Sequence, residues 1–327
     1  MRARRPVLVS LLASLPALLF GAVSPLAAQA ADYPEKPIRL IVPFAAGGGV
    51  DALARPLARE MGEVLGQSVF VDVKPSNTGQ IGAIEVAHAP ADGYTLLISS
   101  AAFATTPAYY PKVPYHPVKD FEAITILATT PQVLVANASY PVGNVADVLQ
   151  IARSGKQVNF ALSGSTGVQA LATELLSSLG KVELTKVPYK GAGAAFADLI
   201  GGQVDLMIDN PASSLVHVRS GKLKLLATTG TKRMASMPDT PTVAETLPGF
   251  EALNWFVLAA PVKTPPAVVQ RLHAAALEAM RRPAMRQLIE RDGLDVRGSS
   301  PAEAREFVAS ENDKWTKIVR EKGLQIQ

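Results

Sequence analysis

The sequence predicts an α/β fold assembled from successive strand–helix units. Short runs of β-branched and apolar residues alternate with longer segments in which apolar residues recur at helical spacing. Beyond residue 30, the 327-residue chain is long enough for one large or two medium-sized domains with real hydrophobic cores. Alternation of strands and helices gives largely parallel, doubly wound sheets, and we expect that architecture here.

The first part of the chain contains the clearest unit. Residues 38–44 predict a strand, and residues 51–65 predict a helix that ends at Gly66, because their apolar side chains recur every three or four positions. The same reasoning predicts strands at 69–73 and 94–99 and a short helix at 81–88.

The alternation continues to the end of the chain. Strands are expected at 133–136, 158–161, 184–187, 206–208, 223–227 and 254–259, and helices at 145–153, 168–179, 194–200, 267–280, 283–291 and 301–322. Proline-rich stretches interrupt the pattern at 107–117 and 237–248. Two such interruptions fit a chain that leaves one domain, builds a second and returns to the first.

The N-terminal segment has the three parts of a secretory signal. Met1 to Arg5 is basic, residues 7–26 are mostly apolar, and Ala28-Gln29-Ala30 supplies small residues for cleavage. We expect cleavage near Ala30 and export to the periplasm. A retained membrane anchor is the alternative, which prolines and a glycine within the apolar stretch disfavour.

Composition excludes several classes of function. Removal of the segment 1–30, with its three arginines and no acid, lowers the formal charge from +4 to +1, which argues against nucleic acid as a partner. The chain has no cysteine, so disulfides and thiolate metal sites are absent. Its four histidines are far apart in sequence and lack metal-ligand spacing, so we expect neither a metal nor a cofactor.

Three loops that follow strands could hold an anion. Gly47, Gly48 and Gly49 precede a helix, whose first turn offers free backbone N–H groups and a partial positive charge. The loop 163–167 also leads into a helix and adds serine and threonine hydroxyls. Ser100 ends another strand, where ligands of open α/β sheets bind. Each loop can also be an ordinary turn, helix cap or solvated loop.

Catalytic interpretations have less support. The chain has no Gly-x-Ser-x-Gly nucleophile elbow, and Asp205 and Asp209 are the closest approach to a pair of catalytic acids. An exported hydrolase therefore remains a remote alternative. We expect no catalytic residues.

With these loops in place, the chain resembles the periplasmic solute receptors of tripartite tricarboxylate transporters, also called Bug proteins. The resemblance covers essentially all residues after the signal. It rests on ordered motifs that include Tyr33-Pro34-x-Lys36-Pro37, Val42-Pro43-Phe44, Gly47-Gly48-Gly49-x-Asp51, Asp92-Gly93-Tyr94, Val187-Pro188-Tyr189-Lys190-Gly191 and Pro241-Thr242-Val243-Ala244-Glu245.

The resemblance implies a class II periplasmic binding protein fold with two doubly wound domains joined by a two-strand hinge. Domain 1 would comprise residues 31–130 and 254–327, and domain 2 residues 131–253. Such a receptor, expected as a monomer, captures a small carboxylate in the cleft and delivers it to membrane permease subunits. A sensor that passes the solute signal to a signalling system is the alternative.

The resemblance also implies which residues contact the solute. They are Phe44, Gly48, Gly49 and Asp51 in the first loop, Ser100 and Ala101, Ser163, Gly164, Ser165, Thr166 and Gly167 in the second loop, and Tyr189, Lys190, Gly191 and Asp209 on the far wall. We expect Asp51, beside an anion site, to disfavour uncompensated dianions or to pair with an ammonium group.

Overall fold

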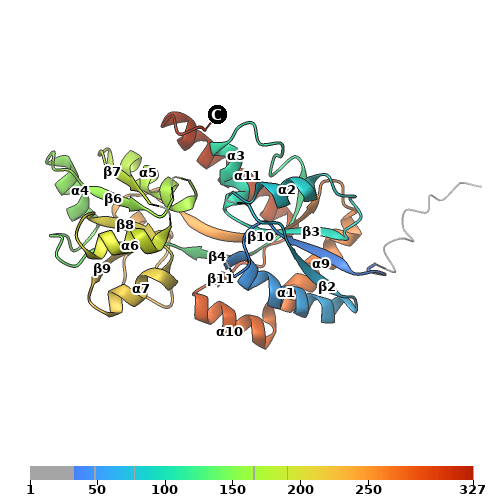
Figure 1. Cartoon of the computed structure of the whole chain (residues 1–327). Coiled ribbons are helices and arrows are strands. Elements are labelled where there is room, and N and C mark those ends of the chain that lie inside the picture. The colour runs from blue at the N-terminus through green and yellow to red at the C-terminus, as the bar shows by residue number, and fades with distance from the viewer. Residues whose placement is uncertain (1–32, 48, 77, 165, 190, 327) are drawn as a thin grey trace, which may run out of the picture. The chain divides into compact units, whose positions relative to one another are not determined.

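The computed structural model describes residues 33–47, 49–76, 78–164, 166–189 and 191–326. The expected signal segment, residues 1–30, lies outside them. Within the described residues, the elements form two separate β-sheets, each covered by helices (Figure 1).

The first sheet has six strands in the order β11-β4-β10-β3-β1-β2. Its strands β1, β2 and β3 are parallel and span Ile38–Val42, Val69–Val73 and Thr95–Ser100. The other three run antiparallel to their neighbours and span Phe121–Pro131 (β4), Leu253–Pro261 (β10) and Asp295–Val296 (β11). The carboxyl ends of β1 and β3 therefore lie at one edge of this sheet, where their loops meet.

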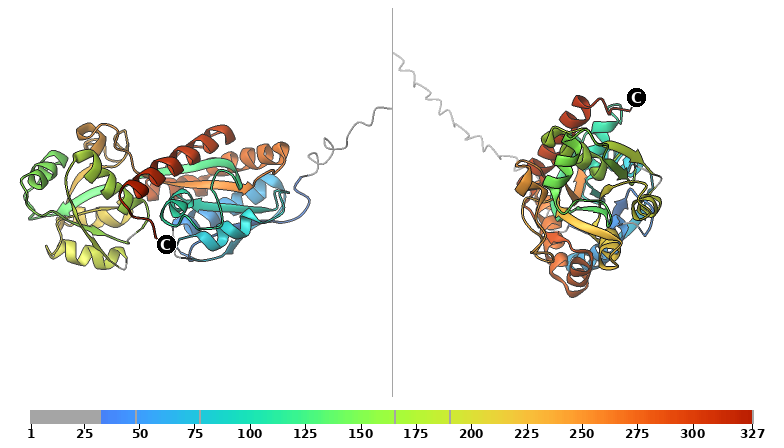
Figure 2. Two further views of the ribbon diagram at one scale, coloured as in Figure 1. Left: turned by 90° about the horizontal axis from the view of Figure 1, so that it is seen from above. Right: turned by 90° about the vertical axis from the view of Figure 1, so that its left-hand side faces the viewer.

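Helices pack on this sheet through their apolar stripes. Helix α11 contacts α3 and β4, whereas α9 contacts α1 and β4 (Figure 2). Helix α1 buries Leu53, Leu57 and Met61 on the side that faces the sheet. The helices span Gly49–Leu65 (α1), Gln80–Ala87 (α2), Ala102–Tyr109 (α3), Pro266–Arg281 (α9), Pro283–Asp292 (α10) and Pro301–Glu321 (α11).

The second sheet has five strands in the order β7-β6-β8-β5-β9. They span Val133–Asn137 (β5), Asn159–Leu162 (β6), Thr185–Pro188 (β7), Leu206–Asp209 (β8) and Leu223–Thr228 (β9). The associated helices are Val145–Arg153 (α4), Val168–Gly180 (α5), Ala192–Ile200 (α6), Pro211–Arg219 (α7) and Val243–Thr246 (α8).

Two crossings connect the sheets. The chain passes from β4 to β5 through the fully buried Gln132, and it returns from β9 to β10 through residues 229–252. Thr229 ties the crossings together, because its Oγ1 accepts a hydrogen bond from the Gln132 N–H at 2.7 Å and donates one to the Ala252 carbonyl at 2.6 Å. These bonds leave neither backbone group unsatisfied at the point where the strands leave their sheets.

The sheets are mixed rather than largely parallel, so that part of the prediction was wrong. The reason is the double crossing, because β4 and β10 both extend toward the second sheet and must lie antiparallel to each other. The sequence pattern also gave no strand for β4 and no helix for α3 or α7. The proline-rich stretch 107–117 was expected to interrupt the pattern, whereas Pro107 lies inside α3. Pro211 is the first residue of α7, a position that proline favours.

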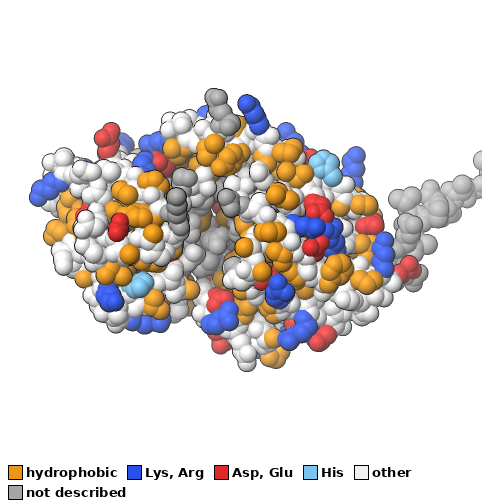
Figure 3. Space-filling view, in the orientation of Figure 1, with side chains coloured by type: hydrophobic (Ala, Val, Ile, Leu, Met, Phe, Trp, Pro, Cys, Tyr) orange, Lys and Arg blue, Asp and Glu red, His pale blue; other side chains and the backbone are white. Residues whose placement is uncertain are grey.

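The surface agrees with the near-neutral charge of the chain after residue 30. Basic and acidic side chains are interspersed over the face shown in Figure 3, without a large area of one sign. No helix in the described part of the chain is long and apolar enough to span a bilayer.

Candidate functional site: a pocket at the strand ends

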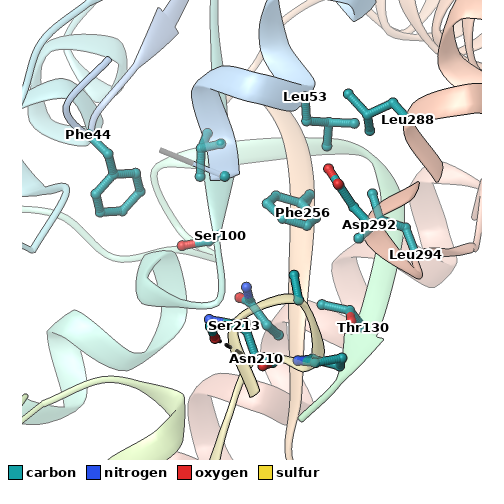
Figure 4. A pocket seen from close by; sticks show the side chains of 15 residues that line it. Phe44, Leu53, Ser100, Thr130, Asn210, Ser213, Phe256, Leu288, Asp292 and Leu294 are labelled. Atoms are coloured by element: carbon teal, nitrogen blue, oxygen red, sulfur yellow. Dashed lines mark hydrogen bonds between the residues drawn. The ribbon is translucent and has the colours of Figure 1, made fainter. Parts of the chain in front are cut away.

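A pocket of about 460 Å³ opens where β3 ends and where α1 and α7 begin (Figure 4). Its lining comes from the first sheet, with Ser100 at the end of β3, Thr130 on β4 and Asn254 on β10, and from residues of the helices α1, α7 and α10. Its volume is within the range of small-molecule binding sites. The carboxyl ends of strands are the usual place for such a site in α/β sheets.

The N-terminus of α1 forms one wall of the pocket. Phe44, from the loop after β1, lines it together with Gly49 and Val50 in the first turn of the helix. Helix α1 begins at Gly49, and the N–H groups in the first turn of a helix have no partner within the helix, so they can bind a solute. This wall therefore offers backbone donors and the positive end of a helix dipole.

Asp51 stabilises this wall from behind. Its carboxylate is buried, accepts the Gly47 N–H at 2.8 Å, and lies 2.9 Å from the Arg55 guanidinium one helical turn away. Burial opposes the charge, but the bonds from Arg55 and Gly47 outweigh it and lower the pKa of Asp51. Asp51 does not line the pocket, and its carboxylate is paired inside the protein, so its contact with the solute stays a prediction.

The N-terminus of α7 forms the opposite part of the pocket. Asn210, Pro211, Ala212 and Ser213 line it, and Asp209 lies directly behind Ser213 at the end of β8. The Ser213 hydroxyl hydrogen-bonds with the Asp209 carboxyl group and also lies 3.0 Å from the Asn210 carbonyl. Burial raises the pKa of Asp209, although the bonds from Ser213 and Asn210 act in the other direction.

Apolar side chains cover a third side. Leu53, Phe256, Leu288 and Leu294 gather there, with Asp292 among them (Figure 4). Both oxygens of Asp292 are engaged by the Arg291 guanidinium, at 2.7 and 2.9 Å. The side thus suits the hydrocarbon part of a solute rather than a charged group.

Gly79 fixes the position of Phe44. It precedes α2 in a left-handed conformation with φ of 74°, and a Cβ there would lie 2.7 Å from the Phe44 ring. Only glycine meets both conditions. The loop before α2 thereby supports a pocket wall that comes from the loop after β1.

The structure brings together only part of the expected site. Phe44, Gly49 and Ser100 line the pocket, Ala101 is buried next to Ser100, and Asp209 lies behind Ser213. Gly48, Ser165 and Lys190 lie outside the described residues.

The remaining expected residues do not line this pocket in the described structure. They are Ser163, Gly164, Thr166 and Gly167 of the second loop, and Tyr189 and Gly191. The Tyr189 hydroxyl instead donates to Asp198 at 2.7 Å. Helix α5, which follows the second loop, contacts the crossing at Gln132. The side-chain amide of Gln169, in the first turn of α5, donates a hydrogen bond to the side-chain oxygen of Gln132 at 3.2 Å.

Sequence reasoning missed the α7 side of the pocket. Asn210, Ser213 and Thr130 were not among the expected residues, and neither were Asn254 and Phe256. A usable signal was the proline that follows the strand ending at Asp209, because proline is common in the first turn of a helix. Within the described residues, no group of three or more His, Cys, Asp or Glu residues could hold a metal ion.

Two α/β sheets joined by two crossings, with a pocket at strand ends, are the architecture of two-domain solute-binding proteins. The model of the tripartite tricarboxylate transporter family receptor matches residues 53–324. The chain therefore belongs to this family of receptors. It also has the mixed α/β, two-domain fold of periplasmic binding proteins, as solved relatives show.

Individual relatives agree with this assignment. The chain is 35% identical to protein BugT of Bordetella pertussis over 94% of this chain and 95% of BugT. It is 34% identical to Rhodopseudomonas palustris Rpa4515, solved with adipate, with a TM-score of 0.74 over 89% of this chain and 99% of the other. It is 32% identical to MatC of the same organism, solved with bound malate, with a TM-score of 0.72 over 88% and 100%.

Proposed function

We propose that this protein is a periplasmic receptor that captures a small carboxylate in the pocket and delivers it to the membrane permease of a tripartite transporter. The N-terminus of α1 is the observation that carries the proposal. It opens into the pocket at Gly49, where the first-turn N–H groups have no partner within the helix, and the acid in this turn, Asp51, is paired with Arg55. An anion at this end is favoured by both the donors and the dipole.

The related structures support a carboxylate as the anion. Rpa4515 was solved with adipate and MatC with malate, and both are small carboxylates. In this chain, a carboxylate at α1 would place the rest of the solute against the apolar side formed by Leu53, Phe256 and Leu288. A few charge-assisted hydrogen bonds in a desolvated pocket supply roughly the −8 kcal/mol of micromolar binding.

The proposed receptor has two domains that close on the solute. Residues 31–130 with 254–327, and residues 131–253, would act as two domains that close on the solute by bending at the crossings through Gln132 and Thr229. The second loop, 163–167, and residues 189–191 would contact the solute only in the closed form. The segment 1–30 would direct export, and the mature chain would act as a monomer.

Binding of carboxylates tests the proposal. The mature chain would be unfolded and refolded to remove any carried-over solute, and its thermal midpoint measured with mono-, di- and tricarboxylates, amino acids and aromatic acids. Binding to the folded state raises the midpoint by mass action. We expect a shift with at least one class of acid, and no shift with the matching amides. The absence of any shift across the panel would refute carboxylate capture.

A further inference from the structure

The two ends of the pocket differ in how their acids are compensated. At α1, Asp51 is paired with Arg55, so the wall is neutral apart from the helix dipole. At α7, Asp209 is 2% exposed, and the described residues contain no cation paired with it. The carboxyl group instead accepts from the Asn210 N–H and bonds to Ser213 at the start of the helix. It thereby offsets the positive end of α7.

Ser213 is the residue through which Asp209 reaches the pocket. A serine hydroxyl has one proton, and both partners of the Ser213 Oγ lie inside the protein, at Asp209 and at the Asn210 carbonyl. If Asp209 is ionised, its carboxylate and the Asn210 carbonyl can only accept hydrogen bonds, so the Ser213 hydroxyl proton is donated to one of these two groups. If Asp209 is protonated, it can donate to Oγ while the hydroxyl donates to the carbonyl. In both states Ser213 presents only lone pairs to the pocket.

Thr130 repeats this arrangement beside it. Its hydroxyl donates to the Pro131 carbonyl at 3.3 Å, so its oxygen also presents lone pairs to the pocket. The side-chain amides of Asn210 and Asn254 carry both donors and acceptors, although the Asn254 Oδ1 also accepts the Trp255 N–H at 3.1 Å. The hydroxyl oxygens at this end thus select for a group that donates.

We infer that the solute carries a hydrogen-bond donor, a hydroxyl or an ammonium group, at the end that faces Ser213, and that Ser213 selects it over a second carboxylate. The inference rests on the proposed function, because it takes the carboxylate to be held at α1. A second carboxylate at α7 would meet the lone pairs of Ser213, with the Asp209 carboxyl group directly behind them, so that acceptors would face acceptors. Hydroxy or amino carboxylates fit both ends.

Acids of equal length provide the test. Isothermal titration of the mature chain would compare butanoate, 4-hydroxybutanoate, 4-aminobutanoate and succinate, and then hexanoate, 6-hydroxyhexanoate, 6-aminohexanoate and adipate. One of the two chain lengths should fit the pocket better. Within that series, we expect the hydroxy or amino acid to bind at least tenfold tighter than the diacid of the same length. The hydroxy and amino members decide between a hydroxyl and an ammonium group.

A pair of neighbouring serines provides matched variants. Ser213→Ala removes the oxygen and should lower the preference for the donor acid over the unsubstituted acid about tenfold. Ser214 is the control, because it is fully buried, does not line the pocket, and its Oγ has no hydrogen-bond partner among the described residues. Ser214→Ala should retain the wild-type preference.

The outcomes separate this inference from the proposed function. Equal or tighter binding of succinate or adipate, or an unchanged preference in Ser213→Ala, would overturn the inference while carboxylate capture stands. Binding of no acid in either series would overturn both.

Discussion

Arg55 neutralises Asp51 across one turn of α1, with Nη2 2.9 Å from Oδ1 and Nε 2.9 Å from Oδ2. Asp51 belongs to the first turn of the helix that opens into the pocket, where an unpaired carboxylate would repel an anionic solute. The pairing leaves the helix dipole and the Gly49 end free to act on the solute. Arg55 is therefore a positioning residue that acts through Asp51.

Removal of Arg55 tests this role. Arg55→Gln leaves the buried Asp51 carboxylate without its cation, so we expect about tenfold weaker binding of a carboxylate and a higher pKa for Asp51. Arg59→Gln is the control, because Arg59 lies on the same helix, pairs with Glu60 and does not line the pocket. Titration calorimetry measures both. Equal losses in the two variants would show that Arg55 acts only on the stability of α1.

Gly79 and Gly66 form a second matched pair. Both have positive φ, 74° and 71°, but a Cβ at Gly66 meets no atom within 4 Å, whereas one at Gly79 meets the Phe44 ring. Gly66→Ala should cost about 1 kcal/mol of stability through backbone strain alone. Gly79→Ala should cost more and should also weaken solute binding, because Phe44 must move. Urea unfolding and calorimetry would check this, and identical behaviour of the two variants would contradict it.

Glu311 organises the tryptophans. Its Oε2 accepts from Trp255 Nε1 and Trp315 Nε1, each at 3.0 Å, and its side chain is buried. Glu311→Leu would leave two buried indole donors unsatisfied, at a cost of about 2–5 kcal/mol. Glu311→Gln retains an acceptor oxygen and should lose less. The chain contains only these two tryptophans, so their fluorescence reports the urea transition directly. A smaller loss for Leu than for Gln would exclude this role.

The Arg233–Glu245 pair predicts a pH dependence. Arg233 and the Thr242 N–H hold the pKa of Glu245 at about 2, below its usual range. A depressed carboxyl pKa contributes stability that is fully present above the unfolded-state pKa and is lost as pH falls toward the folded-state value. Wild type should thus exceed Glu245→Gln in stability at pH 7, and the difference should shrink between about pH 5 and 2. A difference that is constant over this range would argue against the pairing.

Local sequence signals predicted most of the fold. Val69–Val73 and Val145–Arg153 coincide with their predicted ranges, because β-branched runs and helical periodicity are properties of the segment itself. The 11-residue β4 was missed, although it is almost wholly buried. Its continuous apolar and threonine-rich run lacks alternation, and its role as a crossing depends on partners far away in sequence.

The part of the candidate site that lies at the glycine-rich start of α1 was predictable, because the glycines themselves indicate it in the sequence. The glycines before α1 indicated free N–H groups, and Phe44 and Gly49 line the pocket. The partnership of Asp51 with Arg55 could have been inferred from their spacing of one helical turn, but its burial could not. Asn254 and Phe256 reach the pocket only because β10 pairs with β3, a long-range contact that no local pattern encodes.

The most direct test of carboxylate capture at α1 compares Gly49→Pro with Gly49→Ala. Proline is tolerated in the first position of a helix and removes the backbone N–H, whereas alanine retains it, and a Cβ at this position meets no atom within 4 Å. Calorimetry with an acid that binds wild type should show at least about tenfold weaker binding for Gly49→Pro and near wild-type binding for Gly49→Ala. Equal affinities of the two variants would contradict the account, because the carboxylate would then be held elsewhere.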